Sequence, residues 1–212
     1  MPPHPLGPPY RIETPRLVLR CWEPADAPAR SALVERNLDR LMLRRRLRGD
    51  EGEPKSPEER LTEVRQMRAR FDLDEMWSYA VLTSGDGALV SVATLFRVPP
   101  TGADIGLFAW CGAEYDGQGY EAEAGAALAR VAYELLDVPR LYAACPADDA
   151  ASAALFRELG FTPDGTERHL DGAGVRRDQQ LWSLLPGEWP ASRAAARAPD
   201  ALAFGALGDR LF

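Results

Sequence analysis

Lysine and histidine are nearly absent from this sequence: Lys55 is the only lysine, and the two histidines are His4 and His169. Nucleotide hydrolysis on a phosphate loop requires a Gly-Lys-Ser/Thr sequence, and none occurs. A histidine-based catalytic triad or a multi-histidine metal site has too few candidates, because His4 lies among prolines near the start. Acidic residues are plentiful, but no spaced cluster of them indicates a metal ligand set. We therefore expect no metal.

Cysteines and long apolar runs are also scarce. The three cysteines, Cys21, Cys111 and Cys145, are odd in number and lack metal-ligand spacing, which predicts buried, reduced thiols. No basic segment followed by an apolar run opens the chain, and no stretch approaches the ~20 apolar residues of a membrane span. These absences predict a cytoplasmic protein with no membrane partner.

Positive charge is in deficit overall, with a formal net charge of −7 and an isoelectric point near 5.0. This balance argues against a nucleic-acid or membrane-surface binder, which needs a basic face. Basic residues are nevertheless concentrated between Arg36 and Arg70, where eleven Lys or Arg face seven Asp or Glu. The densest run is Arg44 to Arg48, for which a solvated surface and a phosphate contact are the two alternatives.

The domain organisation follows from length and composition. A chain of 212 residues with 46% hydrophobic content suits one compact domain. Residues 1–9 contain five prolines and predict a flexible arm, whereas residues 10–185 carry the periodic patterns of a folded domain. Residues 186–212 are rich in Ala, Pro and Arg and predict an irregular tail with at most one short helix.

Hydrophobic periodicity and turn residues predict the order of elements in that domain. The order is strand, two helices, three antiparallel strands, a long alanine-rich helix, strand, helix and a hairpin. Capping residues mark several helix ends, among them Ser56 with Pro57 and Glu59, and Asp148 or Asp149 before a helix that Gly160 closes. The predicted strands cover 10–22, 77–83, 88–98, 104–111, 140–145, 161–170 and 175–185, and the helices 26–41, 56–71, 119–138 and 149–159.

One turn could hold a phosphate. The segment from Asp116 to Ala122 contains Gly117 and Gly119 and lies between a strand and the alanine-rich helix. The N–H groups of 117 to 122 are therefore orphan donors at the positive end of a helix dipole, and glycine lets an anion approach the main chain. A two-glycine turn before a helix is also structurally ordinary, so both interpretations stay open here.

Several segments resemble one known family. They are Ile12 to Arg20, Asp104 to Leu107, Tyr115 to Tyr120, Ala151-Ser152, Leu159 to Phe161 and Glu188-Trp189, in that order. Together they resemble the GNAT superfamily, and in particular its branch of ribosomal-protein alanine N-acetyltransferases, over roughly residues 11 to 189. The resemblance implies an α/β (α+β) fold in which a central, mixed, mostly antiparallel sheet is splayed mid-sheet and has helices on both faces.

The same resemblance implies a coenzyme site and a reaction. Acetyl-CoA or another acyl-CoA would lie in the gap beside strand 104–111, and an amine would attack its thioester directly. Ser152 matches the hydroxyl that protonates the departing thiolate, with helix capping as its alternative role. Asp104 is the candidate base, with a solvated strand start as the alternative. The implied coenzyme-binding residues are Phe108, Trp110 and Cys111 for pantetheine, Gly117, Gln118, Gly119, Tyr120, Glu121 and Ala122 for pyrophosphate, and Asp149 near the thiol.

The implied acceptor is a small-molecule amine or a peptide N-terminus. Acceptors in such proteins contact the first two helices and the late hairpin loop, which correspond to residues 24–72 and 170–175. These segments contain no motif that names the acceptor. The protein could act as a monomer or as a homodimer, because the hairpin could present an edge strand.

Three acidic residues depart from the family pattern. Asp116, Glu121 and Asp149 stand where the family usually has Arg or Gln, a small residue, and Asn. A carboxylate a few ångströms from a pyrophosphate repels it by ~1 to 4 kcal/mol. Glu121 could also bond to the helix amides itself. The alternative hypothesis is therefore a GNAT-fold protein that has lost acyl-CoA use and binds a ligand or performs different chemistry in the same cleft.

Overall fold

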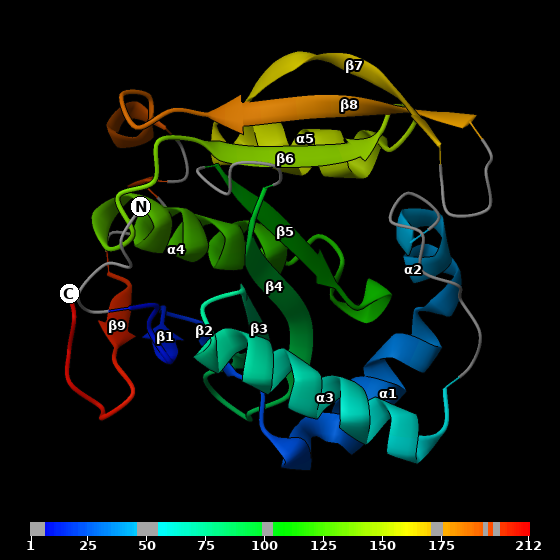
Figure 1. Ribbon diagram of the computed structural model, residues 1–212, viewed down its shortest axis with the longest axis vertical. Helices are drawn as coiled ribbons and strands as arrows, with labels where there is room; N and C mark the ends of the chain where they lie inside the picture. The colour runs from blue at the N-terminus through cyan, green and yellow to red at the C-terminus, as the bar shows by residue number, and fades with distance from the viewer. Residues whose placement is uncertain (1–6, 46–54, 99–103, 171–175, 193–194, 197–199) are drawn as a thin grey trace.

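The architecture is one nine-stranded sheet with helices on both faces (Figure 1). A computed structural model describes residues 7–45, 55–98, 104–170, 176–192, 195–196 and 200–212. The strand order is β7-β8-β6-β5-β4-β3-β2-β1-β9, and every neighbouring pair is antiparallel except β5 and β6. The strands are β1 Arg11–Glu13, β2 Leu17–Cys21, β3 Met76–Thr83, β4 Leu89–Arg97, β5 Ile105–Cys111, β6 Leu141–Pro146, β7 Thr162–Leu170, β8 Arg176–Leu184 and β9 Leu202–Phe204.

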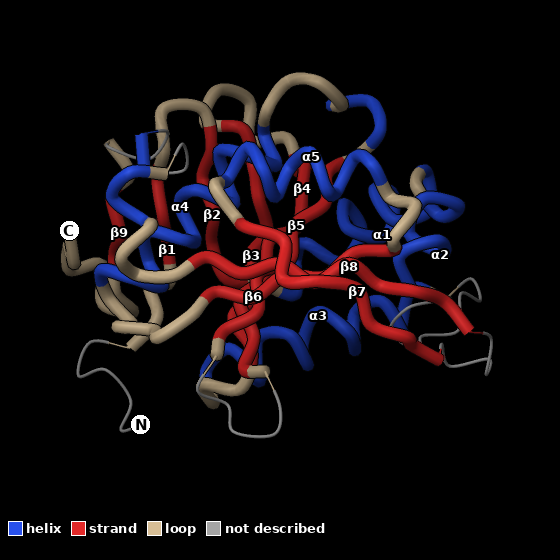
Figure 2. Tube along the Cα trace, turned by 90° about the horizontal axis from the view of Figure 1, so that it is seen from above, coloured by secondary structure: helices blue, strands red, loops and turns tan. Residues whose placement is uncertain are grey.

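The helices form a layer on each side of the sheet, as the view from above shows (Figure 2). On one face, α4 packs on β4 and β5 and is joined by α5; on the other face lie α1 and α3. The helices are α1 Ala27–Arg36, α2 Leu38–Arg45, α3 Pro57–Asp72, α4 Tyr120–Glu134 and α5 Ala150–Leu159, with 3₁₀ segments at Pro24–Asp26, Ala113–Tyr115 and Trp189–Ala191. The predicted fold class is confirmed.

The sheet opens between its two parallel strands. β5 and β6 pair only at Ile105 with Leu141 and at Gly106 with Tyr142. The later residues of the two strands are not paired with each other. The Phe96 ring packs directly on Gly106, since a Cβ at this position would lie 2.2 Å from the ring. The aromatic ring thus covers the strand where the gap begins. The predicted splay is confirmed and lies on the carboxyl-terminal side of this pair.

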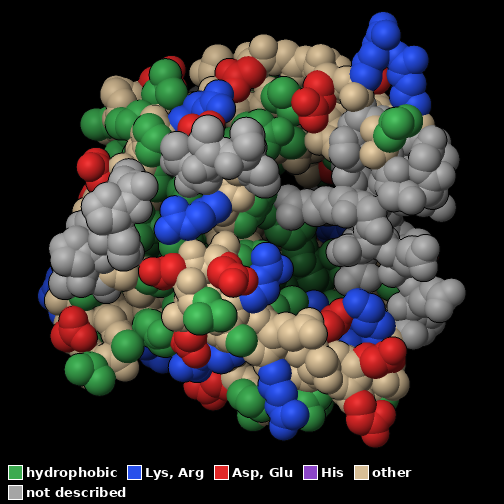
Figure 3. Space-filling view, viewed as in Figure 1, with side chains coloured by type: hydrophobic (Ala, Val, Ile, Leu, Met, Phe, Trp, Pro, Cys, Tyr) green, Lys and Arg blue, Asp and Glu red, His purple; other side chains and the backbone are tan. Residues whose placement is uncertain are grey.

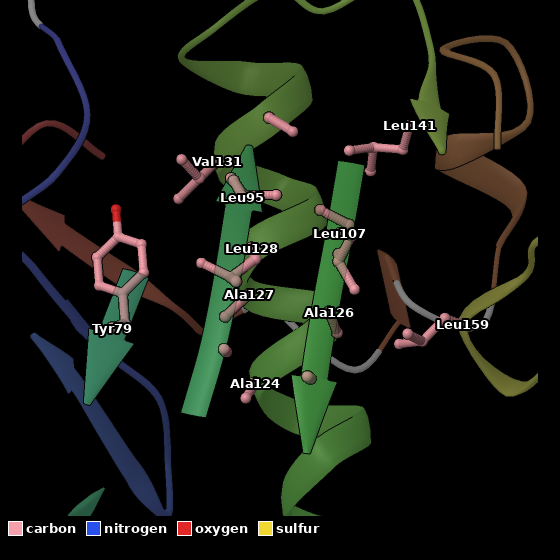
Figure 4. Packing of buried hydrophobic residues seen from close by; sticks show 14 of the residues in the cluster. Tyr79, Leu95, Leu107, Ala124, Ala126, Ala127, Leu128, Val131, Leu141 and Leu159 are labelled. Carbon is pink, nitrogen blue, oxygen red and sulfur yellow. The ribbon is translucent and has the colours of Figure 1, made fainter. Parts of the chain in front are cut away.

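The alanine-rich face of α4 makes the larger core (Figure 4). Ala124, Ala126 and Ala127 are fully buried against β4 and β5, because small side chains let helix and sheet approach closely. Helix α4 also packs closely against α5 at Gly125, because a Cβ at this position would lie 2.8 Å from Leu159. Burial of a side chain such as Leu128 contributes about 1.5–3 kcal/mol.

The opposite face has its own core. Trp22, Leu33, Val64 and Trp110 are buried between the sheet and helices α1 and α3. β5 alternates accordingly: Leu107 and Ala109 belong to the α4 core, whereas Phe108 and Trp110 belong to this one. One strand therefore supplies side chains to both faces beside the splay.

Three segments differ from the sequence-based expectation. The helix expected over 26–41 is broken at Asn37, whose amide donates to Leu33 O at 2.9 Å and accepts from Ala113 N at 2.7 Å. The expected tail contributes strand β9, which pairs with β1 and extends the sheet. Pro8 and Pro9, expected in the flexible arm, are buried, and Pro9 O accepts from Tyr79 Oη at 2.9 Å. Residues 1–6 lie outside the described part of the chain.

The three cysteines are buried thiols outside any disulfide, as predicted. Within the described residues, none of the helices has the length and apolar character needed to cross a membrane. The same residues contain no group of three or more His, Cys, Asp or Glu side chains arranged to hold a metal ion.

Candidate coenzyme and acceptor sites

The turn before α4 has the backbone geometry of an anion site. Gly117 and Gly119 have φ of +75° and +76°, a region that favours glycine, and Gly119 is the N-cap residue of α4 with no side-chain capping bond. Glu123 N is the first amide that donates back, to Gly119 O at 3.0 Å, so the N–H groups before it lack helical acceptors. Gln118 differs from the prediction, because its N–H donates to Tyr115 O at 3.2 Å.

Glu121 contacts the end of β5. Its Oε1 accepts from the backbone N of Cys111 at 3.0 Å. That this carboxylate also occupies the α4 amides stays a prediction. Glu121 thus takes a strand amide beside the splay, where an extended ligand running along β5 would find a donor.

Two other carboxylates near the turn are paired with arginines from α1 and α2. Asp116 accepts from Arg40 Nη1 at 2.6 and 2.8 Å, and Glu114 accepts from Arg36 Nη2 at 3.0 Å. Burial lowers the pKa of Arg40, but its hydrogen bond to Asp116 and the charges of Asp116 and Glu121 outweigh this and raise it. The repulsion that Asp116 would exert on a phosphate is thereby offset by an adjacent cation.

Arg16 secures the first turn of α4. The side chain of Glu123 is only 9% exposed, and its carboxylate accepts from Arg16 Nε at 2.6 Å and from Thr14 Oγ1 at 2.6 Å. Arg16 also donates to Gln118 O at 2.8 Å, and its guanidinium lies 5.0 Å from the centre of the Tyr120 ring. No sequence pattern indicates a role for Arg16 or Arg40, because their partners lie more than 70 residues away along the chain.

A cavity of about 350 Å³ occupies the gap between β5 and β6, and is here called the coenzyme cleft. It brings the predicted residues Phe108, Asp149 and Ser152 together. It adds Tyr142 and Glu167, which no sequence pattern had indicated. The remaining lining residues are Phe96, Ala109, Ala144, Cys145, Pro146, Leu155, Phe156 and Gln179.

Asp149 and Ser152 form a closed pair at the start of α5. Asp149 caps the helix by accepting from Ser152 N at 3.0 Å, and it also accepts from Ser152 Oγ at 2.6 Å. Ser152 thus takes part in the helix cap that Asp149 makes, and it is buried and lines the cleft. Its role toward the coenzyme stays a prediction. Its hydroxyl proton points to the carboxylate, so the oxygen lone pairs are what remains for a ligand.

Asp104 lies apart from this pair. It directly precedes β5, at the end where β5 and β6 still pair, and its Oδ2 accepts from Arg140 Nη2. It is not among the residues that line the coenzyme cleft, so the structure does not bring the two predicted catalytic residues together.

A second cavity, of about 390 Å³, lies between α1, α3 and the face of β3, β4 and β5. It is here called the acceptor cavity. Phe108 lines both cavities, which places their junction at β5. Trp110, predicted to contact the coenzyme, lines the acceptor cavity and belongs to the α1 and α3 core instead. Figure 3 shows this side of the molecule hollowed between the β7–β8 hairpin and α3.

Charged groups of the acceptor cavity gather on Glu63. Its carboxylate accepts from Lys55 Nζ, from Arg30 Nη1 at 2.6 Å and from Arg60 Nη1 at 3.4 Å. Burial would raise the pKa of Glu63, but the hydrogen bond from Lys55 and the charge of Arg30 outweigh it and lower the pKa to about 2. Glu63 is therefore a permanent anion held by cations.

Comparison with known proteins identifies the architecture. The family model described as "Acetyltransferase (GNAT) domain" matches residues 16–162. RimJ from Mycobacterium smegmatis, solved with CoA-disulfide, is similar with a TM-score of 0.77 and 21% identity over 94% of this chain and 96% of that chain. The ribosomal-protein-S5-alanine acetyltransferase from Vibrio fischeri has a TM-score of 0.69 and 18% identity over 84% and 98%. RimL, a ribosomal L7/L12 alpha-N-protein acetyltransferase solved with coenzyme A, has a TM-score of 0.70 and 20% identity over 85% and 97%.

These solved structures share the fold, and the family model covers more than half of the chain. Nothing in the comparisons supports the alternative of a protein that has lost acyl-CoA use. The chain belongs to the acetyltransferase (GNAT) domain family and is an N-acetyltransferase.

Proposed function

We propose that this protein transfers an acetyl group from acetyl-CoA, bound in the coenzyme cleft, to an amine held in the acceptor cavity. The observation that carries the proposal is the uncapped start of α4, beside a sheet that opens between β5 and β6. Backbone amides at such a terminus bind phosphate through hydrogen bonds and the helix dipole. Similar structures contain coenzyme A or acetyl-CoA, which favours the same ligand here.

The N–H groups of Gly117, Gly119, Tyr120 and Ala122 are the proposed pyrophosphate donors. A Cβ at Gly117 would meet nothing within 4 Å, so the main chain there is open to an approaching ligand. From the turn, the pantetheine would run beside β5 toward Phe108, and the thiol end would reach Asp149 and Ser152. The coenzyme supplies an activated thioester, and the protein supplies its position.

The reaction in this arrangement is a direct substitution. The unprotonated amine forms a C–N bond to the acetyl carbon while the C–S bond breaks, the ammonium proton passes to solvent, and the thiolate gains a proton. We assign Ser152 to that last step, in which its hydroxyl gives a proton to the thiolate and regains one from solvent. Because its proton is shared with Asp149 in the resting site, the hydroxyl must turn toward the sulfur to donate it.

The acceptor is proposed to be the N-terminal amine of a protein or peptide. Proteins of similar fold that carry the names ribosomal-protein-S5-alanine acetyltransferase and L7/L12 alpha-N-protein acetyltransferase favour this class over an unrelated small amine. Residues 171–175, in the loop expected to contact the acceptor, lie outside the described residues. The acceptor cavity is therefore the proposed binding site for the acceptor amine.

Calorimetric titration with acetyl-CoA, followed by mass spectrometry of a peptide acceptor, tests the proposal. We expect saturable heat and the gain of one acetyl group at the peptide N-terminus. Gly119→Val should weaken coenzyme binding, because a β-branched residue at φ of +76° distorts the turn. Gly208→Val is the matched control: its φ is +82°, and it lies in the C-terminal segment beyond β9. No heat at millimolar acetyl-CoA would sink the proposal.

A further inference from the structure

The acceptor cavity carries an excess of positive charge. Among the side chains that the structure describes, its lining contains three cations, Arg30, Lys55 and Arg70, and one carboxylate, Glu63. The remaining lining residues are uncharged. This composition contrasts with the chain as a whole, whose formal net charge is −7. A positively charged cavity attracts anionic ligands.

The one carboxylate is not available to an incoming ammonium group. Glu63 already accepts hydrogen bonds from Lys55, Arg30 and Arg60, and its side chain is only 17% exposed. A fourth cation would have to displace one of these partners. Arg60, which is 1% exposed, adds a further positive charge directly behind the lining.

Arg70 is the least committed of the three cations. Its Nε lies 3.6 Å from a carboxylate oxygen of Glu75, beyond normal hydrogen-bond distance, and both side chains are about half exposed. Such a surface pair contributes little, so an anion in the cavity can compete for the guanidinium. Planar, bidentate binding of carboxylates is what guanidinium groups do best.

The floor of the cavity adds a polar donor. Ser78 and Thr94 are both at least nine-tenths buried and line the cavity on β3 and β4. Ser78 Oγ accepts from Trp22 Nε1 at 3.1 Å, and the two hydroxyls share one hydrogen bond of 3.1 Å. In the shared bond, Thr94 Oγ1 donates its proton to Ser78 Oγ. The hydroxyl proton of Ser78 therefore remains available for an acceptor atom in the cavity.

This donor lies close to the reaction path. Thr94 on β4 pairs in register with Phe108 on β5, and Phe108 lines both the acceptor cavity and the coenzyme cleft. A ligand reaching from Arg70 past the hydroxyls arrives at the junction of the two cavities. Its anionic part would then lie within the cavity while its amine faces the thioester.

We infer that the acceptor bears a carboxylate close to the amine that is acetylated, and that Arg70 and the Ser78–Thr94 pair bind that carboxylate. The inference rests on the proposed function, which assigns the amine to this cavity. The carboxylate can come from an acidic first residue of a peptide or from a free amino acid. The shared chemistry is an amine and a carboxylate within one residue of each other.

Matched acceptors test this inference. The peptide pair is aspartyl-alanyl-alanine amide and its asparaginyl counterpart; the free pair is alanine and alaninamide. We expect kcat/KM about tenfold higher for the carboxylate member of at least one pair, and the pair that shows it identifies the source. Arg70→Glu should abolish the preference. Arg65→Glu, an exposed residue of α3 that lines neither cavity, should leave the preference within about twofold of wild type.

Acetyl-CoA affinity is measured on the same samples by calorimetry. Coenzyme binding and acetylation with no carboxylate preference in either pair would overturn this inference while leaving the proposed function intact. The same holds if Arg65→Glu and Arg70→Glu change the preference equally. Absence of coenzyme binding would overturn the proposed function itself, and this inference with it.

Discussion

The turn before α4 and the start of α5, the proposed pyrophosphate and thiol ends of the coenzyme site, both carry acidic residues, and the consequences differ. At the proposed pyrophosphate end, Asp116 is paired with Arg40, and the nearby Glu123 with Arg16. At the proposed thiol end, Asp149 holds the Ser152 proton and forms no ion pair with another described side chain. We therefore expect the effect of each carboxylate on coenzyme binding to depend on whether an arginine or a serine hydroxyl is its partner.

Burial separates the two arginine pairs further. Asp116 is 55% exposed and Arg40 26%, so water screens their interaction and its contribution is about 0–1 kcal/mol. Glu123 is 9% exposed, and a carboxylate buried to that degree depends on its cation. The pyrophosphate end thus contains one strong and one weak compensation, which substitutions can distinguish.

The largest effect is expected from Arg16→Ala. It leaves Glu123 as a buried, uncompensated anion in the first turn of α4, beside the proposed phosphate site. We predict a coenzyme Kd about 30-fold higher, or about 2 kcal/mol, by calorimetry. Arg11→Ala is the matched control, since Arg11 has the same 48% exposure and a surface ion pair with Glu13. Equal effects of the two substitutions would show that Arg16 has no special role.

Asp149→Asn tests the thiol end. An asparagine can still cap α5, and its amide would donate to Ser152 Oγ, which frees the hydroxyl proton to face the cleft. We predict single-turnover acetylation about tenfold faster, because a bond between a hydroxyl and a carboxylate is no longer broken during the reaction. The gain should vanish in the double variant with Ser152→Ala. A gain that persists without the hydroxyl would remove Ser152 from the mechanism.

Glu121→Ala probes the second carboxylate at the proposed pyrophosphate end. Removing the carboxylate frees Cys111 N–H for the pantetheine and removes repulsion of the phosphates, so we predict about fivefold tighter coenzyme binding. Glu121→Gln separates the two causes, since it removes the charge and keeps an oxygen for Cys111. If both variants bind as wild type does, Glu121 is neutral toward the coenzyme.

The smallest effect is expected from the exposed pair. Arg40→Ala should weaken coenzyme binding about threefold by leaving Asp116 uncompensated, and Asp116→Asn should tighten it about threefold by releasing Arg40. The double variant should return close to wild type, and both single effects should shrink in high salt because the pair is exposed. Single effects that keep their size in high salt would mean that charge is not their cause.

Much of the fold could be predicted because its signals are local. The capping residues Ser56 and Glu59, the helix-closing Gly160 and the apolar run of β5 all depend on neighbours in the chain. Strand β9 was missed because Leu202–Phe204 is short and is stabilised by pairing with β1, almost two hundred residues away. The break at Asn37 likewise depends on the distant amide of Ala113.

The site was predictable only in part, for the same reason. Gly119 and Asp149 are visible as turn and cap residues, whereas the partners that decide their chemistry are not. Nothing in the residues around Asp116 or Glu123 indicates Arg40 or Arg16, and nothing around Asp104 indicates that Arg140 binds it. Long-range ion pairs need the folded chain, so the sequence-based expectation of repulsion did not include the arginine beside Asp116.

The most direct test of the central claim, that the α4 amides are open to a diphosphate, is an NMR titration of the ¹⁵N-labelled protein. Coenzyme A and inorganic pyrophosphate are added separately, and the amide resonances of Gly117, Gly119, Tyr120 and Ala122 are followed. We predict saturable shifts of these amides with both ligands, and shifts of the cleft residues around Ser152 with coenzyme A alone. If coenzyme A shifts the resonances of the cleft residues but leaves those four amide resonances unchanged, the central claim is contradicted.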